Sequence, residues 1–150
     1  MTITTFERVI TSSIDGIFAC DASFKITLWN PGMEFITGVT REDAVDRPLL
    51  EVFPRLEETG DQASLQEALD GETTIAKESI YALGDGDRPV FFEIHFSPLR
   101  NEAGARVGGV AFFRNITERK LAEQALKDLS VRDPLTNLYN RRYFNKRIEE

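Results

Sequence analysis

The sequence predicts an α+β fold, in which a five-stranded antiparallel sheet carries short helices on one face and a C-terminal linker helix follows. Three observations lead to this prediction. Two β-rich runs stand within residues 16–29, three more lie within 73–116, and several short helical segments separate the two groups. Antiparallel strands joined by turns, with the helices gathered in one part of the chain, are typical of this fold class.

The N-terminal part predicts a helix and a hairpin. The apolar residues of TFERVITSSI recur at helical spacing, which predicts an amphipathic flanking helix within residues 1–12. The β-rich runs at 16–20 and 24–29 predict a hairpin because turn residues separate them. Alternate residues of a strand share a face. The apolar face of the second run therefore holds Phe24, Ile26 and Leu28.

Short helices are predicted after the hairpin. Asn30 is a good N-cap residue and Pro31 suits the first helical position, so PGMEFIT forms a helix that Gly38 ends. Thr40 begins a second helix, because TRED resembles a capping box with Asp in place of Glu. Two further helical segments are LLEVF, between two prolines, and DQASLQEALD at 61–70.

The three later strands are TTIAKESIYAL, PVFFEIHFSPL and RVGGVAFFRNI, joined by turns rich in Gly, Asp and Asn. In the middle strand one alternating set is purely apolar, and we expect it to face the core: Val90, Phe92, Ile94 and Phe96. The other set is mixed and is expected to face outward: Phe91, Glu93, His95 and Ser97.

Residues 117–130, TERKLAEQALKDLS, contain no Gly, Pro or aromatic residue and predict a helix. An apolar stripe runs along it: Leu121, Ala122, Ala125, Leu126 and Leu129. Two interpretations stay open. The helix packs back on its own domain, or it pairs with the same helix of a second chain as a short parallel coiled coil.

Composition indicates a single globular domain, with 41% hydrophobic and 29% charged residues in a chain of 150. The net charge of −7 lies mainly in residues 1–115, and an acidic body repels phosphate backbones, so no nucleic-acid partner is expected. Cys20 is the one cysteine, and MTITTFERVI resembles no secretion signal. No stretch approaches the roughly 20 apolar residues of a membrane span. We expect a cytoplasmic location and no membrane segment within this sequence.

Four stretches in chain order resemble a PAS domain: Asn30-Pro31, Thr37-Gly38, Ser97-Pro98-Leu99 and the NITERK run at 115–120. The resemblance implies an N-terminal flanking helix over 1–12, a PAS domain over 13–116 and a signalling helix over 117–132. It also implies that a signal passes through the junction and the helix, at Asn115, Ile116, Thr117, Leu121, Ala125 and Leu129.

Two positions depart from the usual PAS pattern. Asn115 replaces the customary Asp, so an ion pair at the exit of the domain is in question. Asp46 stands where relatives often have Gly, which indicates a left-handed backbone there.

The run DPLTNLYNRRYF at 133–144 resembles the beginning of a GGDEF domain, the diguanylate cyclase module that joins two GTP molecules into cyclic di-GMP. Residues 133–150 would then be the truncated start of that domain, with a turn at Asp133 to Thr136 and a helix from Arg141 onward. The catalytic motif of such domains lies beyond residue 150, so we expect no catalytic and no metal-binding residues in this segment. The alternative is a basic helical tail without special meaning.

The PAS resemblance implies a mainly apolar pocket between the sheet and the short helices. The residues expected to line it are Ile26, Leu28, Asn30, Phe35, Leu50, Phe53, Phe92, Ile94 and Phe96. A hydrophobic core without any ligand is the alternative, because ten of the eleven phenylalanines precede residue 115 and can fill the space.

No cofactor is predicted. His95 is the only histidine and lies on a mixed strand face, whereas haem-binding relatives take their ligand from the helix corresponding to 61–70, which has no histidine. Cys20 ends a strand, unlike the helical cysteine of flavin photoreceptors of the LOV type. A flavin beside Trp29 and Asn30 is a less favoured alternative, because Asn30 already has a capping role.

The sequence thus predicts a sensory PAS module that controls a downstream diguanylate cyclase, itself a signal-transduction enzyme acting on GTP. It would form a homodimer through the N-terminal helix, the outer sheet face and the linker helix, and would take a small apolar ligand. The alternative is a ligand-free module for dimerisation or partner docking.

Overall fold

A computed structural model of the chain describes residues 5–71, 73–83 and 88–131. Its strands are β1 (Gly16–Asp21), β2 (Ile26–Trp29), β3 (Ile75–Leu83), β4 (Arg88–Arg100) and β5 (Arg106–Asn115). Its helices are α1 (Thr5–Ser12), α2 (Pro31–Thr37), α3 (Arg41–Ala44), α4 (Leu49–Val52), α5 (Arg55–Glu58), α6 (Asp61–Asp70) and α7 (Thr117–Val131). The chain divides into two units, one ending at Asn115 and one beginning at Ile116.

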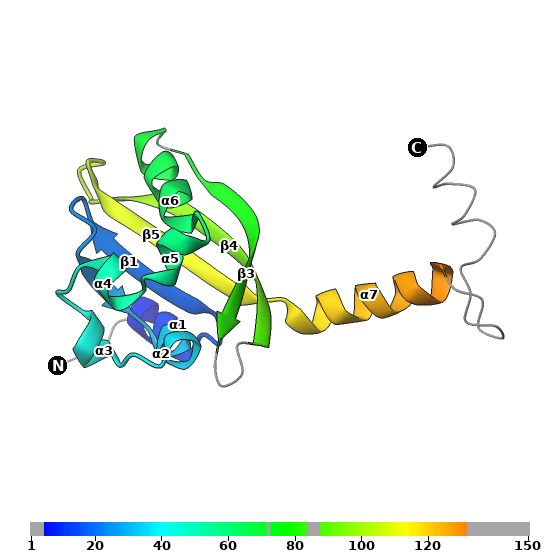
Figure 1. Cartoon of the computed structure of the whole chain (residues 1–150). Helices are drawn as coiled ribbons and strands as arrows, with labels where there is room; N and C mark the ends of the chain where they lie inside the picture. The colour runs from blue at the N-terminus through cyan, green and yellow to red at the C-terminus, as the bar shows by residue number, and fades with distance from the viewer. Residues whose placement is uncertain (1–4, 72, 84–87, 132–150) are drawn as a thin grey trace. The chain divides into compact units, whose positions relative to one another are not determined.

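The five strands form one antiparallel sheet in the order β2-β1-β5-β4-β3 (Figure 1). The first strand therefore pairs with the last, from Gly16 opposite Phe113 to Asp21 opposite Gly108. A Cβ atom at Gly108 would collide with the carbonyl oxygen of Cys20, so glycine allows this close approach. The predicted fold class is confirmed.

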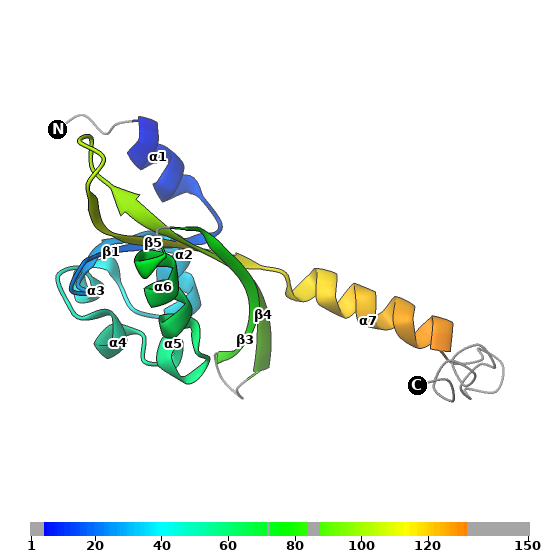
Figure 2. The ribbon, with the colours of Figure 1, turned by 90° about the horizontal axis from the view of Figure 1, so that it is seen from above.

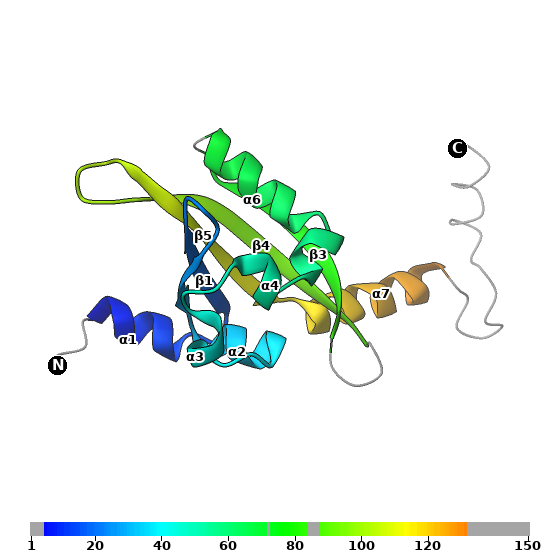
Figure 3. The same ribbon diagram turned by 60° about the vertical axis from the view of Figure 1, so that its left-hand side comes forward.

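Helices α2 to α6 cover one face of the sheet, and α1 lies on the opposite face (Figure 2). The four short helices from α2 to α5 follow one another around the end of the sheet that carries β1 and β2, whereas α6 lies across β3 and β4 (Figure 3). Within the described part of the first unit, one face of the sheet is thus covered by five helices, and α1 is the one helix on the other face.

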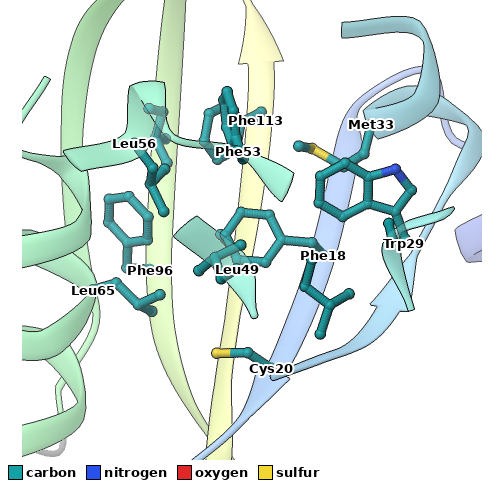
Figure 4. Packing of buried hydrophobic residues seen from close by; sticks show 14 of the residues in the cluster. Phe18, Cys20, Trp29, Met33, Leu49, Phe53, Leu56, Leu65, Phe96 and Phe113 are labelled. Atoms are coloured by element: carbon teal, nitrogen blue, oxygen red, sulfur yellow. The ribbon is translucent and has the colours of Figure 1, made fainter. Parts of the chain in front are cut away.

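The hydrophobic core lies between the sheet and helices α2 to α6, where Phe18, Trp29, Met33 and Phe113 meet (Figure 4). The inward set predicted for β4 is confirmed, since Phe92, Ile94 and Phe96 are buried and Val90 packs against the core at its edge. These residues alternate with half-buried ones on the outer face. The period of two in the sequence therefore predicted the inner face of β4 correctly.

Local signals also placed the short helices. Asn30 caps α2, Pro31 is its first residue, and Gly38 follows it in the left-handed conformation with φ 77°. The side chain of Thr40 caps α3. Asp46 has φ 71°, which confirms the left-handed backbone expected at that position. The one-turn helix α5 was not predicted.

The second strand differs from its prediction. Phe24 has φ 62° and belongs to the turn, so the strand begins only at Ile26. A bulge then interrupts the pairing of β2 with β1, because Cys20 faces Ile26 while Ala19 faces Leu28. One extra residue reverses the side-chain alternation. Trp29 is therefore buried on the same side as Ile26, and Leu28 lies on the other face.

Helix α7 lies in the second unit, and its leucines are exposed: Leu121 by 61%, Leu126 by 67% and Leu129 by 68%. The predicted helix is confirmed over its described length. Across the described ranges, no helix is both long and apolar enough to cross a membrane. The segment predicted to begin a GGDEF domain, 133–150, lies outside the described residues.

Candidate functional site

The interior beneath the sheet is filled with aromatic rings. The ring of Phe113 in β5 lies between 5.6 and 6.5 Å, centroid to centroid, from five others: Phe18, Phe53, Tyr81, Phe92 and Phe96. Tilted and edge-on contacts at these separations are favourable. Five residues predicted to line a pocket are at most 3% exposed and pack in this core: Ile26, Phe53, Phe92, Ile94 and Phe96.

Three other predicted lining residues lie elsewhere. Leu28 is half-buried and faces away from the core because of the bulge in β2. Leu50 in α4 is half-buried at the edge of the core. Phe35 in α2 is 91% exposed, because α2 turns Met33 inward and Phe35 outward. The expectation that Leu28 and Phe35 point into the interior is wrong.

Asn30 is buried and makes four hydrogen bonds. Its Oδ1 accepts from the backbone N–H of Ile17 (2.8 Å) and of Met33 (3.0 Å). Its Nδ2 donates to the backbone oxygens of Ile10 (3.1 Å) and Asp15 (2.9 Å). A side-chain amide has two donor hydrogens and two acceptor lone pairs, so all are used. Asn30 therefore links α1, β1 and α2, and these four bonds occupy its side-chain amide.

A polar cluster lies inside the domain around Asp61, which begins α6 and is 0% exposed. The hydroxyl of Ser79 donates to Asp61 Oδ1 (2.7 Å), and the hydroxyls of Thr59 and Tyr81 donate to Oδ2. The ammonium of Lys77 lies 2.9 Å from Oδ1. A buried carboxylate with these partners is satisfied, so the cluster ties α6 to the inner face of β3.

Burial raises the pKa of Tyr81 above its ordinary value, and the hydrogen bond to Asp61 raises that pKa further. Tyr81 therefore stays protonated and remains a donor to the carboxylate. This cluster was not predicted from the sequence, although the sequence of β3 contains a pattern that indicates it. Lys77, Ser79 and Tyr81 alternate on the face that pairs with the inward residues of β4. Polar residues at every second position of an inward face indicate a buried partner.

His95 and Cys20, the two residues considered for a cofactor, lie in different surroundings. His95 stands on the outer sheet face with its Nε2 3.1 Å from Glu93 Oε1, and its side chain is 45% exposed. Cys20 is buried in β1, and burial raises the pKa of its thiol to about 11. No group of three or more His, Cys, Asp or Glu residues in the described ranges has metal-binding geometry.

A hollow of about 420 Å³ opens beside the C-terminal end of α2. It is bounded by α2, by the ends of β3 and β4 that lead into their connection, and by the end of β5. Of the residues expected to line a pocket, Phe35 and Phe92 border this hollow, Phe35 at its exposed edge and Phe92 from the core.

The predicted signal-coupling residues lie at the end of β5 and along α7. Asn115 is its last residue and pairs with Phe92 of β4. Ile116 is 4% exposed, and Thr117 begins α7. Leu121, Ala125 and Leu129 are exposed along α7. The last residue of the sheet is thus joined to the exposed helix by one intervening residue.

The chain belongs to the PAS fold family, whose sequence profile matches residues 10–121. Solved structures agree with this at the level of the fold. A PAS domain from Colwellia psychrerythraea superimposes with a TM-score of 0.60 and 23% identity, covering 75% of this chain and 94% of that one. VqmA of Vibrio cholerae gives a TM-score of 0.66 at 16% identity, over 78% of this chain and 53% of VqmA.

Two proteins of Escherichia coli K12 are similar in sequence. The probable diguanylate cyclase DgcE is 30% identical over 140 residues, and the signal transduction histidine-protein kinase AtoS is 26% identical over 120. The matches cover 89% and 80% of this chain. The chain spans only 12% of DgcE and 19% of AtoS. PAS domains similar to this one therefore occur in signalling proteins with different output domains.

Proposed function

We propose that this PAS domain is a sensory module that controls a diguanylate cyclase following it in a longer, cytoplasmic protein. The observation that carries the proposal is the 30% identity with DgcE over 89% of the chain. The resemblance of residues 133–144 to the start of a GGDEF domain also supports it. The parent protein would then convert GTP into cyclic di-GMP, and the segment described here would regulate that reaction without catalysing it.

Helix α7 is the element proposed to transmit the signal. Its exposed leucines provide an apolar stripe that a second copy of the helix could cover. Two cyclase domains each hold one GTP, so the rate depends on how the two domains face each other. A paired helix joined to both domains changes that orientation when it rotates or shifts. The proposed homodimer would also use α1 and the outer sheet face.

An insertion experiment in the full-length protein tests this function. One residue inserted after Ala125 rotates the following segment by about 100°, whereas seven residues add about two whole turns. We expect the single insertion to abolish cyclase activity or to leave it constant and unregulated. The seven-residue insertion should retain regulated activity. Activity is measured as cyclic di-GMP formed from GTP. Equal activity and regulation in both variants would contradict the proposal. Absence of cyclase activity in the unmodified full-length protein would also contradict it.

A second function is favoured by one observation, the apolar residues exposed on the strands: Ile80 by 56%, Phe112 by 42%, Val107 by 40% and Leu99 by 36%. Together with the filled interior, they favour a module that docks a partner or a second copy and takes no ligand. Native mass spectrometry separates the alternatives, since a bound small molecule in stoichiometric amount supports sensing and its repeated absence supports docking.

A further inference from the structure

The hollow beside α2 lies outside the filled interior and has the size of a ligand site. Its volume of about 420 Å³ falls within the range of roughly 300–1,000 Å³ that small-molecule sites occupy. Its walls come from α2, from the ends of β3 and β4 and from β5. These elements belong to the sheet and its helical cover, so the shape of the hollow is set by packed secondary structure.

The lining residues that the structure describes are mostly apolar and carry no charge. Seven of these ten residues have aliphatic or aromatic side chains, and the other three are Thr37, Gly38 and Asn115. The hydroxyl of Thr37 donates to the backbone oxygen of Met33 (2.7 Å) and accepts from the N–H of Val39 (3.2 Å). A charged molecule would lose its hydration without gaining an ionic partner from these residues. A neutral molecule has a much smaller free energy of hydration to lose.

The rim and the floor of the hollow differ in exposure. At the rim, Ile14 is 96% exposed and Phe35 is 91% exposed. At the floor, Phe92 and Phe113 are 1% and 0% exposed and belong to the aromatic core. An apolar molecule seated here would cover the rim residues and the half-buried side chains of Leu83 and Val90, above a floor of rings that belong to the core.

We propose that this hollow binds a small neutral molecule with an apolar body of one or two rings. Its body lies against Phe35, Leu83 and Val90 and reaches the end of β5 at Asn115. The proposal deepens the sensory function proposed above by assigning a site and a ligand class. Phe113 and Asn115 both belong to β5, whose end leads into α7. The ligand therefore contacts the strand from which the signal would leave the domain.

Binding of the neutral fluorescent probe N-phenyl-1-naphthylamine to the 150-residue chain tests the site. We expect saturable binding of one probe per chain. The anionic probe 8-anilinonaphthalene-1-sulfonate has similar rings and adds a sulfonate. It should bind about tenfold more weakly, because no lining cation compensates its desolvation. No saturable binding of the neutral probe overturns the site, and equal or tighter binding of the anionic probe overturns the ligand class.

Matched substitutions locate the probe. Val90→Phe fills the hollow and should raise the Kd about tenfold or more, whereas Val107→Phe, on an exposed part of β5, should leave it within about twofold. Phe35→Ala removes an exposed rim residue without touching the core, and it should weaken binding several-fold more than Ile80→Ala. Equal effects of the members of both pairs overturn the proposal.

The amide resonances of the chain provide an independent readout. The probe should shift the signals of Thr37, Gly38 and Leu83 and leave those of the outer sheet face, such as Ile80, unchanged. Shifts centred on Ile80 and Phe112 would place the probe on the other apolar surface and overturn the proposal. These measurements need no cyclase domain, so their failure leaves the proposed output function untouched, and a failed insertion experiment leaves the ligand site untouched.

Discussion

The carboxylate of Asp61, fully buried at the start of α6, lies 2.9 Å from the ammonium group of Lys77 in β3. The side chain of Lys77 is 31% exposed, so the cation reaches from the protein surface to a carboxylate inside it. This ion pair and the hydroxyls of Thr59, Ser79 and Tyr81 satisfy the carboxylate oxygens. The arrangement joins the longest helix of the sheet's cover to the sheet itself.

Removing the charge of Asp61 should destabilise the domain. Asp61→Asn turns an NH2 group toward a hydroxyl or toward Lys77, so the free energy of unfolding should fall by about 2 kcal/mol or more. Glu67→Gln, at an exposed position of the same helix, should change it by less than about 0.5 kcal/mol. Urea denaturation of the two variants makes the comparison. Equal stability of both variants would show that the buried carboxylate contributes nothing.

Asn30→Ala should be among the most damaging polar substitutions in the domain. It removes the cap of α2 and leaves the N–H of Ile17 and the oxygens of Ile10 and Asp15 without their side-chain partner. We expect a loss of about 2–4 kcal/mol in the free energy of unfolding.

Asn101 provides the matched control for Asn30. It is exposed, and its side chain accepts a hydrogen bond from the N–H of Ala105 (3.0 Å). Asn101→Ala should cost about 1 kcal/mol or less, because water replaces the lost partner. Chemical denaturation in which both variants lose the same stability would contradict the structural role assigned to Asn30.

The Cys20 thiol should make stability depend on pH in the alkaline range. Its pKa rises from 9.0 in the unfolded chain to about 11 in the folded one, because burial disfavours the thiolate. Above pH 9 the unfolded state releases this proton while the folded state keeps it. The contribution of Cys20 is therefore fully present below pH 9 and is lost as pH rises toward 11.

The comparison with Cys20→Ala isolates this effect, since the other titrating groups are shared. The stability advantage of the wild type over the variant should shrink by about 2 kcal/mol between neutral pH and roughly pH 10.5. Denaturation curves at the two pH values measure the change. A constant difference between the two proteins would mean that the thiol ionises equally in the folded and unfolded chain.

Asp46→Gly should stabilise the protein. Asp46 has φ 71°, a conformation that costs a residue with a Cβ atom about 1 kcal/mol and costs glycine little. Asp43→Gly places the same substitution inside α3, where glycine should destabilise by about 1 kcal/mol. Melting temperatures should therefore shift in opposite directions. A decrease in both variants would show that the side chain of Asp46 matters more than its backbone.

Features governed by neighbouring residues could be predicted from the sequence. The cap at Asn30, the stop at Gly38 and the left-handed position at Asp46 each depend on the conformational preference of one or two residues. The inward face of β4 followed from strict alternation over a long strand. The same reasoning failed in β2, where a bulge in the pairing with β1 reversed the faces of Leu28 and Trp29.

The candidate site was less predictable than the fold. Most residues expected around a ligand fill the core, whereas the observed hollow combines two of them, Phe35 and Phe92, with segments far apart in the chain. The cluster around Asp61 was also missed, because a carboxylate at a helix start is normally exposed. The carboxylate of Asp61 gains its partners on β3 only because α6 packs against that strand.

By itself, the sequence determined most of the elements, with their caps and turns, and the family to which the chain belongs, because these depend mainly on residues close together along the chain. The tertiary structure alone decided which side chains meet: the pairing of β1 with β5, the burial of Trp29 and Asp61, and the open hollow beside α2. The physical reason is that burial is a property of contacts between distant segments. Neither a bulge nor a buried ion pair leaves a local signal strong enough to fix those contacts in advance.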